Sequence, residues 1–357
     1  MKPENNKEIA WINSLKGGCI ILVVLYHVVL PGYANTVDYL TAGTLPAKIW
    51  IAFNDTLSPL RMPAFFFVSG LLASDAIINR QWKQVFTSRV TNLFYLYFLW
   101  GLIQWLMING VSGEIMGKQL SGNLNAAWAA TPAEFIKLML LAMSSSWYLY
   151  ALALFFVFAK LFHRFKPALM LMAVGLNYAA ICNVIPGWGP ESLSQYFVFF
   201  LFGVFYSSTL IRWSEWHRGN GWRWATLIAL AAVHALLGLP ESIFMCTLAI
   251  LFCIAACRLL NRLFTLRWLN WTGKNTLQIY VLHRIFIEFF GMSTILFATG
   301  HDLFASQAFS MLWAVAFPAV MVGVCIGCSV AVWTLLNHGP GKGLFIYPKL
   351  LRMKLHG

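Results

Sequence analysis

The chain has 357 residues, of which 60% are hydrophobic, 16% aromatic and only 10% charged, with a mean hydropathy of +0.70 and a net charge of +13. Soluble domains carry roughly 25% charged residues, so this chain lacks the charge needed to cover a water-facing surface. The composition excludes a soluble enzyme, a disordered chain and a secreted disulfide scaffold, and it predicts an all-α bundle of membrane-spanning helices forming a single domain over residues 1–357.

Apolar runs bounded by polar or turn residues predict ten spans. In chain order they cover residues 12–30, 57–78, 90–109, 147–162, 168–185, 194–211, 222–239, 241–260, 276–298 and 311–336. The first is interpreted as a retained helix, because no small-residue cleavage pattern follows Leu30. In the long segment 110–146, the apolar stretch Phe135–Met143 predicts a re-entrant or interfacial helix.

Basic residues are concentrated in alternate connecting segments. One set of segments holds most of the 25 lysines and arginines: Lys2, Lys7, Lys16, Arg80, Lys83, Arg89, Lys160, Arg164, Lys166, Arg212, Arg218, Arg223, Arg258, Arg262, Arg267, Lys274, Lys342, Lys349, Arg352 and Lys354. The opposite set holds Lys48, Arg61, Lys118 and Lys137. The positive-inside rule predicts this asymmetry for ten spans with both termini in the cytoplasm. The positive charge is therefore topological, and no nucleic-acid partner is expected.

The first span contains two ionisable residues, Lys16 and His27. Such groups inside a span cost at least about 2.5 kcal/mol on insertion scales, so each is a functional hypothesis. Their separation places them on one helix face about 16 Å apart, where they could hold two ends of an extended ligand. For Lys16, snorkelling to the cytoplasmic interface explains the position equally well. A lone histidine such as His27 is often a satisfied packing residue.

The ninth span is the second to contain ionisable residues. Tyr280 and His283 lie along one stripe, while Arg284 and Glu288 are spaced as an i, i+4 pair. Arg284 and Glu288 are interpreted first as a pair that neutralises itself and fixes helix packing. The depth of His283, counted from the cytoplasmic end of its span, would let it meet His27.

No metal site or bound cofactor is expected. The chain has no HExxH motif, P-loop, GxGxxG or GxSxG. The seven cysteines are odd in number and lie mostly in apolar runs, so they are interpreted as packing residues.

Five stretches of the chain match, in order, the motifs of one family of membrane proteins. They are Ile12–Gly17 followed by Leu22–His27 (a basic residue and glycine, then a histidine), Met62–Gly70 (Pro-x-Phe-Phe-x-x-Ser-Gly), Ser146–Leu149 (Trp-aromatic-Leu), Tyr196–Gly203 (an aromatic run ending in Phe-x-x-Gly) and Gly273–His283 (Gly, then Ile-Tyr-x-x-His). The ordered set resembles the acyltransferase-3 family, whose members move acyl groups onto hydroxyls of glycans and related acceptors.

This resemblance implies an O-acyltransferase that moves an acyl group, commonly acetyl, from acyl-CoA to a sugar or envelope glycan. It implies a multi-pass location in the lipid bilayer of a bacterial-type inner membrane. It also makes His27 the general base, a role that suits an imidazole with an unperturbed pKa near 6.5. Because His27 is predicted in the outer half of the membrane, the donor must reach through the bundle from the cytoplasm.

The resemblance also suggests roles for other residues. Lys16 and Arg89 are candidates for binding the donor phosphates, although Lys16 stands where the family usually has arginine and so lacks the planar, bidentate fork. His283, Tyr280 and Ser69 are candidates for orienting the reactants or stabilising the oxyanion, with Ser69 assigned to the donor side.

Two other functions stay open. A proton-coupled transporter of a small metabolite or lipid-linked sugar would use His27, Arg284 and Glu288 as a proton relay. A catalytically silent envelope protein of the same fold gains support from Asn92, because the family commonly has a second arginine three residues after the position of Arg89.

Overall fold

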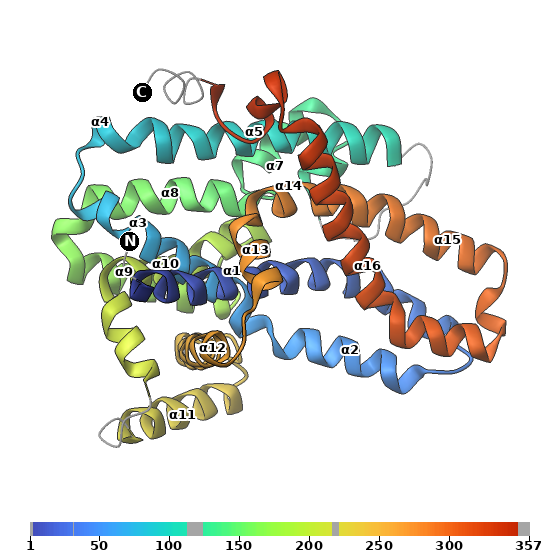
Figure 1. Ribbon diagram of the computed structural model, residues 1–357, viewed down its shortest axis with the longest axis horizontal. Helices are drawn as coiled ribbons and strands as arrows, with labels where there is room; N and C mark the ends of the chain where they lie inside the picture. Colours follow the sequence, from blue (N-terminus) through green and yellow to red (C-terminus); the bar gives the residue numbers. More distant parts are fainter. Residues whose placement is uncertain (1–2, 31, 113–123, 216–220, 349–357) are drawn as a thin grey trace. The chain divides into compact units, whose positions relative to one another are not determined.

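The computed structural model describes residues 3–30, 32–112, 124–215 and 221–348, which form helices and turns without a β-strand among them (Figure 1). The expected all-α class is confirmed. The basic residues Lys2, Lys118, Arg218, Lys349, Arg352 and Lys354 lie outside these described ranges.

The chain divides into two compact units, each made of three separate segments. Unit 1 comprises Met1–Ile20, Ser58–Phe94 and Tyr148–Thr276, and unit 2 comprises Ile21–Leu57, Tyr95–Trp147 and Leu277–Gly357. The division falls inside the first helix, α1 (Pro3–Val29), so its first part belongs to unit 1 and its last part to unit 2. The single domain expected over residues 1–357 stays a prediction.

Unit 1 consists of long apolar helices with short connections. Besides the first part of α1 they are α3 (Ser58–Ile78), α4 (Trp82–Val85), the π-helix η2 (Phe86–Thr91), α8 (Trp147–Phe162), the 3-10 turn η5 (His163–Phe165), α9 (Lys166–Ile181), α10 (Trp188–Ser214), α11 (Gly221–Leu236), α12 (Ile243–Leu263) and α13 (Arg267–Lys274). In Figure 1, α10 lies along α3 and α9, and α12, seen end-on, packs against α3 and α11.

Two glycines allow a close contact between α3 and α10 in unit 1. A Cβ at Gly70 of α3 would overlap the carbonyl oxygen of Phe200, and a Cβ at Gly203 of α10 would overlap the carbonyl oxygen of Phe67. Both glycines end family motifs noted in the sequence. Their role is therefore to let two main chains approach, as small residues do in membrane helix pairs.

A second glycine contact joins α1 to α13. A Cβ at Gly17 or at Gly273 would overlap a carbonyl oxygen of the facing helix. Beside this contact, Ser14, Asn261 and Asn270 form a closed ring of hydrogen bonds of 2.8, 2.9 and 3.2 Å. Such a ring satisfies polar groups that would otherwise be costly to bury.

Unit 2 combines one long helix of 30 residues with several shorter and more irregular ones. They are η1 (Tyr33–Tyr39), α2 (Thr44–Thr56), α5 (Asn92–Trp105), the π-helix η3 (Leu106–Ser112), η4 (Ala126–Trp128), α7 (Pro132–Leu140), α14 (Thr276–Phe286), the π-helix η7 (Ile287–Gly291), α15 (Met292–Gly300), η8 (Leu303–Ala305), α16 (Gln307–Leu336) and η9 (Gly339–Leu344). The first residues of α5 and α14 belong to unit 1.

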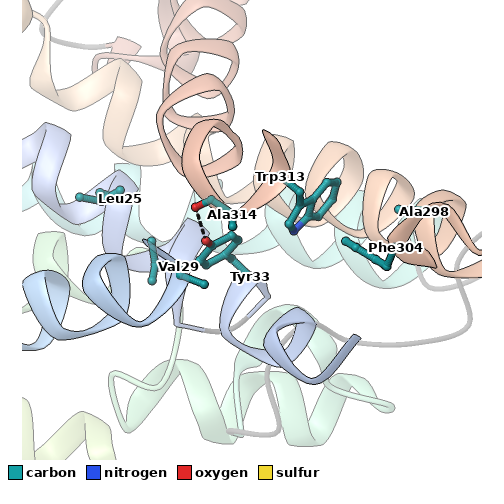
Figure 2. Close-up of a cluster of buried hydrophobic side chains, with 8 residues drawn as sticks. Leu25, Val29, Tyr33, Ala298, Phe304, Trp313 and Ala314 are labelled. Carbon is teal, nitrogen blue, oxygen red and sulfur yellow. Dashed lines mark hydrogen bonds between the residues drawn. The ribbon is translucent and has the colours of Figure 1, made fainter. Parts of the chain in front are cut away.

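A buried apolar cluster holds the end of α1 against α16 (Figure 2). Its members are Leu25, Val29, Tyr33, Ala47, Ala298, Phe304, Trp313 and Ala314. Pro318 lies inside α16 and has no N–H, so it cannot donate to the carbonyl of Ala314 four residues earlier. The Tyr33 hydroxyl donates to that carbonyl at 2.6 Å. Through Tyr33 the cluster therefore satisfies the carbonyl that the proline leaves without a donor, and it also holds α1 in place.

The cluster also sets the direction of His27. Leu25 and Val29 lie one helical turn apart and mark the face of α1 that packs into the cluster. His27 lies between them in sequence, so it projects from the opposite face. The packing of one side of α1 thus presents an imidazole on the other.

All ten predicted spans fall on helices, and eight helical stretches in the described residues are long and apolar enough to cross a membrane. The two numbers differ because α8 and α9 join through η5 into one stretch, Trp147–Ile181, and because α11 has only 16 residues. That length gives about 24 Å, less than the ~30 Å hydrocarbon core. The span count and the cytoplasmic termini stay predictions.

Candidate active site

Two imidazole rings lie side by side in unit 2. His27 near the end of α1 and His283 of α14 have ring centroids 5.3 Å apart, with planes tilted by 40°. The side chain of His283 is 0% exposed, whereas His27 is half-buried. The depths of His27 and His283 along their spans predicted that the two could meet, and the structure places their rings next to each other.

Main-chain carbonyls hold the ring of His283. Its Nδ1 donates to the carbonyl oxygens of Tyr280 at 2.7 Å and Ile279 at 3.1 Å. Its Nε2 is buried and has no hydrogen-bond partner among the described residues. An unpaired buried polar atom is costly, so this nitrogen is a candidate for contact with a reactant.

Arg284 links the histidine pair to a carboxylate. Its Nη1 lies 3.3 Å from Nδ1 of His27, and its Nη2 donates to Oε1 of Glu288. Arg284 is 5% exposed and Glu288 is 1% exposed. The predicted Arg284–Glu288 pair is therefore present, and it also reaches His27.

Glu288 lies in η7, one of three π-helical segments in the described residues. π-Helical turns are rare in proteins, and those that occur often lie at functional sites. Oε2 of Glu288 is buried without a hydrogen-bond partner among the described residues. The pair cancels the charge of Arg284, so a buried cation can lie beside His27 without a net positive charge.

Polar contacts of Gln104 join α5 to α14, the helix that carries His283. Gln104 of α5 is buried, and its Nε2 donates to the carbonyl of Val281 at 2.8 Å. Its Oε1 accepts from the hydroxyl of Ser146 at 3.2 Å. These bonds restrain the turn of α14 that carries His283.

The other predicted residues occupy different places. Tyr280 is buried with its ring centroid 5.9 Å from that of His283, so the structure brings it together with the histidine pair. Lys16, Arg89 and Ser69 belong to unit 1. Lys16 is half-buried on α1 and Arg89 is exposed on η2.

Ser69 is paired with an aromatic hydroxyl of unit 1. Its Oγ lies 2.5 Å from Oη of Tyr148, and either oxygen is able to donate. Tyr148 belongs to the Trp-aromatic-Leu motif, so two family motifs meet at this hydrogen bond.

The sequence grouped Arg284 with His27 only in the transporter alternative, and it did not predict the direct contact between them. A guanidinium has five N–H donors, and one carboxylate cannot satisfy them all. The unsatisfied N–H donors of an arginine inside a span therefore indicate a second hydrogen-bond partner. Its identity, His27, depends on the rotation of α1 about its axis, which the apolar cluster of unit 2 sets.

Comparison with known proteins identifies the family. The Acyltransferase domain of the acyltransferase-3 family matches residues 9–333. The chain belongs to the acyltransferase-3 family. It is 31% identical over 353 residues to the "Inner membrane protein YcfT" of Escherichia coli (strain K12). The aligned residues cover 95% of this chain and 96% of that protein. No solved structure matches the chain.

Membership in the acyltransferase-3 family agrees with the resemblance found in the sequence. The relative from the inner membrane and the long apolar helices confirm the expected location, a multi-pass protein of a bacterial-type inner membrane. The family name assigns acyltransferase activity only in general.

Proposed function

We propose that this acyltransferase-3 family member is a membrane O-acyltransferase that moves an acyl group, in the simplest case acetyl, from acyl-CoA to a hydroxyl of a sugar or envelope glycan. The observation that carries the proposal is the imidazole pair, His27 and His283, inside a chain that matches the Acyltransferase domain along most of its length. Acyl transfer to a hydroxyl needs one group to take a proton and another to stabilise an oxyanion.

The histidine pair has both functions available. A neutral imidazole has one nitrogen that accepts a hydrogen bond and one that donates. One ring of the pair accepts the proton of the attacking hydroxyl, and the other donates to the carbonyl oxygen of the thioester. Tyr280 packs near the ring of His283 and helps to hold it.

Donor binding is assigned to basic residues of unit 1. Arg80, Lys83 and Arg89 are all exposed in or next to α4 and η2, where the phosphates of acyl-CoA would find cationic donors. Lys16 and Ser69 complete the proposed donor group. Asn92, in the position of the family's second arginine, begins α5 directly after η2 and lacks a charge for this task.

One observation also favours a second function, proton-coupled transport. His27, Arg284 and Glu288 form a connected chain of ionisable groups inside the helix bundle, and such groups within spans mark proton and substrate pathways in transporters. The acyltransferase has the stronger support because the family match concerns acyl transfer.

A turnover assay tests the proposal. Purified protein is reconstituted in liposomes with acetyl-CoA labelled in the acetyl group, and octyl glucoside is supplied as a sugar hydroxyl. We expect release of CoA thiol and labelled glucoside, and we expect both to fall at least about 100-fold in H27A because a reacting group is lost. H301A is the matched control, since His301 is an exposed histidine of unit 2 at the end of α15.

One result would contradict the role of His27, and another would contradict the enzyme itself. Equal turnover by H27A and the parental protein would remove His27 from the reaction. Flux of a metabolite that depends on a proton gradient in vesicles without acyl-CoA, together with no thioester cleavage, would establish the transporter instead.

A further inference from the structure

We infer that Arg284 is a positioning residue that makes His27 the hydrogen-bond donor of the pair and leaves His283 as the base. The inference rests on the proposed O-acyltransferase function and deepens it by dividing the chemistry between the two rings. It differs from the role that the family resemblance implies, in which His27 is the base.

The first step concerns the tautomer of His27. Arg284 has only donors, and its Nη1 is 3.3 Å from Nδ1 of His27. A proton on that Nδ1 would face an N–H group, so Nδ1 carries the lone pair and accepts. In a neutral ring the single proton then sits on Nε2. His27 therefore presents an N–H donor at the nitrogen directed away from Arg284.

The second step concerns the tautomer of His283. Its Nδ1 contacts two carbonyl oxygens, at 2.7 and 3.1 Å, and carbonyl oxygens only accept. The proton of the neutral ring therefore sits on Nδ1, and Nε2 carries the lone pair. That Nε2 is buried without a partner among the described residues. His283 is thus held as an acceptor at the nitrogen that is left unsatisfied.

The two rings are therefore complementary. A general-base histidine usually donates its Nδ1–H to a carboxylate or carbonyl, which leaves Nε2 free to accept a proton. His283 has that arrangement. His27 has the reverse, because its Nδ1 accepts from a guanidinium. The ring centroids are 5.3 Å apart, so one reacting group can contact both.

The division gives a balanced reaction. Nε2 of His283 takes the proton of the acceptor hydroxyl as its oxygen bonds to the thioester carbonyl carbon, and the π electrons move to the carbonyl oxygen. That oxyanion accepts a hydrogen bond from Nε2–H of His27. As the C–O double bond re-forms, the C–S bond breaks and the thiolate takes the proton from His283. The products are the ester and the free thiol of CoA.

Glu288 makes the arrangement possible inside an apolar bundle. Its carboxylate accepts from Arg284 and cancels the guanidinium charge. Without it the cation beside His27 would be unpaired, and such a buried charge is strongly disfavoured. Glu288 therefore acts on His27 only through Arg284.

Nitrogen NMR tests the tautomers without any turnover. Protein labelled with ¹⁵N-histidine is reconstituted at a pH where the imidazoles are neutral, and H27N and H283N assign the two rings by loss of signal. We expect a protonated Nε2 on His27 and a protonated Nδ1 on His283. A protonated Nδ1 on His27 would overturn the inference while leaving the proposed acyl transfer untouched.

Variants of the pair show whether Arg284 is the cause. In R284M/E288L the charged pair is replaced by apolar side chains, and we expect the His27 signals to shift toward a mixture of tautomers. R284K retains a donor and is expected to restore the protonated Nε2. If His27 keeps one tautomer in the apolar double variant, Arg284 is not the positioning residue.

Glutamine substitutions separate the two roles in the turnover assay. A glutamine amide can donate like Nε2–H, but it cannot accept a proton as a base. We expect H27Q to retain activity within about 10-fold of the parental protein and H27A to lose about 10²–10³-fold. H283Q and H283A should lose equally, about 10²–10⁴-fold. The reverse order, with H283Q active and H27Q inactive, would contradict the assignment. No turnover in the parental protein would count against the proposed function alone.

Discussion

Two of the buried cations, Lys160 of unit 1 and Arg284 of unit 2, use their charge in different ways. Lys160 of α8 is 6% exposed, and its Nζ donates to the carbonyls of Ala76, Ile77 and Arg80 at 2.9, 3.1 and 2.6 Å. Arg284 is equally buried, but its contacts are a carboxylate and the ring of His27.

The difference distinguishes a structural cation from a functional one. Lysine has three N–H donors, and Lys160 places all of them on the free carbonyls at the end of α3, where the helix dipole is negative. Nothing titratable is among these partners. Arg284 instead joins groups that titrate, and the neighbouring Nε2 of His283 is unsatisfied. The partners of a buried charge, and not its burial, therefore show its purpose.

The largest effect is expected from breaking the Arg284–Glu288 pair. E288L leaves Arg284 buried without its carboxylate, so we expect the free energy of unfolding to fall by about 3–5 kcal/mol. Unfolding of the detergent-purified protein, followed by circular dichroism, measures the loss. The double variant R284M/E288L should recover most of it, because no charge is then left unpaired. A stable E288L variant would mean that water or another group satisfies Arg284.

A smaller effect is expected at the structural cation. K160M removes three hydrogen bonds and leaves carbonyls of α3 without a donor, which we expect to cost about 2–3 kcal/mol. Turnover of acetyl-CoA per folded molecule should stay at the parental level, in contrast to the loss in H27A. Unfolding and turnover are measured on the same preparation, and a selective loss of turnover in K160M would end the distinction between the two cations.

The smallest effect is expected at Tyr33, which lies close to His27 in sequence but has a structural contact. Y33F leaves the carbonyl of Ala314 without the donor that Pro318 cannot supply, at a cost of about 1–2 kcal/mol. We expect lower thermal stability and unchanged ¹⁵N shifts for His27. Altered tautomer signals would show that the apolar cluster does more than orient α1.

The long spans were predictable because apolar composition alone defines them. The predicted range 147–162 coincides with α8, and 57–78 is within one residue of α3. Among the shorter helices, α2 and α13 were missed. With 13 and 8 residues they are too short to span, and polar residues such as Lys48 and Arg267 interrupt any apolar run.

The candidate site was predictable in its residues but not in its connections. Depth along two spans placed His27 near His283 because helical rise is constant. Which ring nitrogen meets which partner depends on side-chain rotation and on the packing of α1 in unit 2. The hydrogen bond from Gln104 to α14 had no local signal, since it joins residues 177 positions apart.

The π-helix η7 has one more consequence. A turn closed by i→i+5 bonds takes up one residue more than an α-helical turn, so α15 is out of phase with α14 by about 100°. Glu288 belongs to this π-helical turn, while Ala298 of α15 packs in the apolar cluster that holds α1. Deleting a single residue between Ile287 and Gly291 would therefore rotate one helix against the other. The number of residues in η7, and not only their composition, therefore sets the rotation between Glu288 and the apolar packing that orients His27.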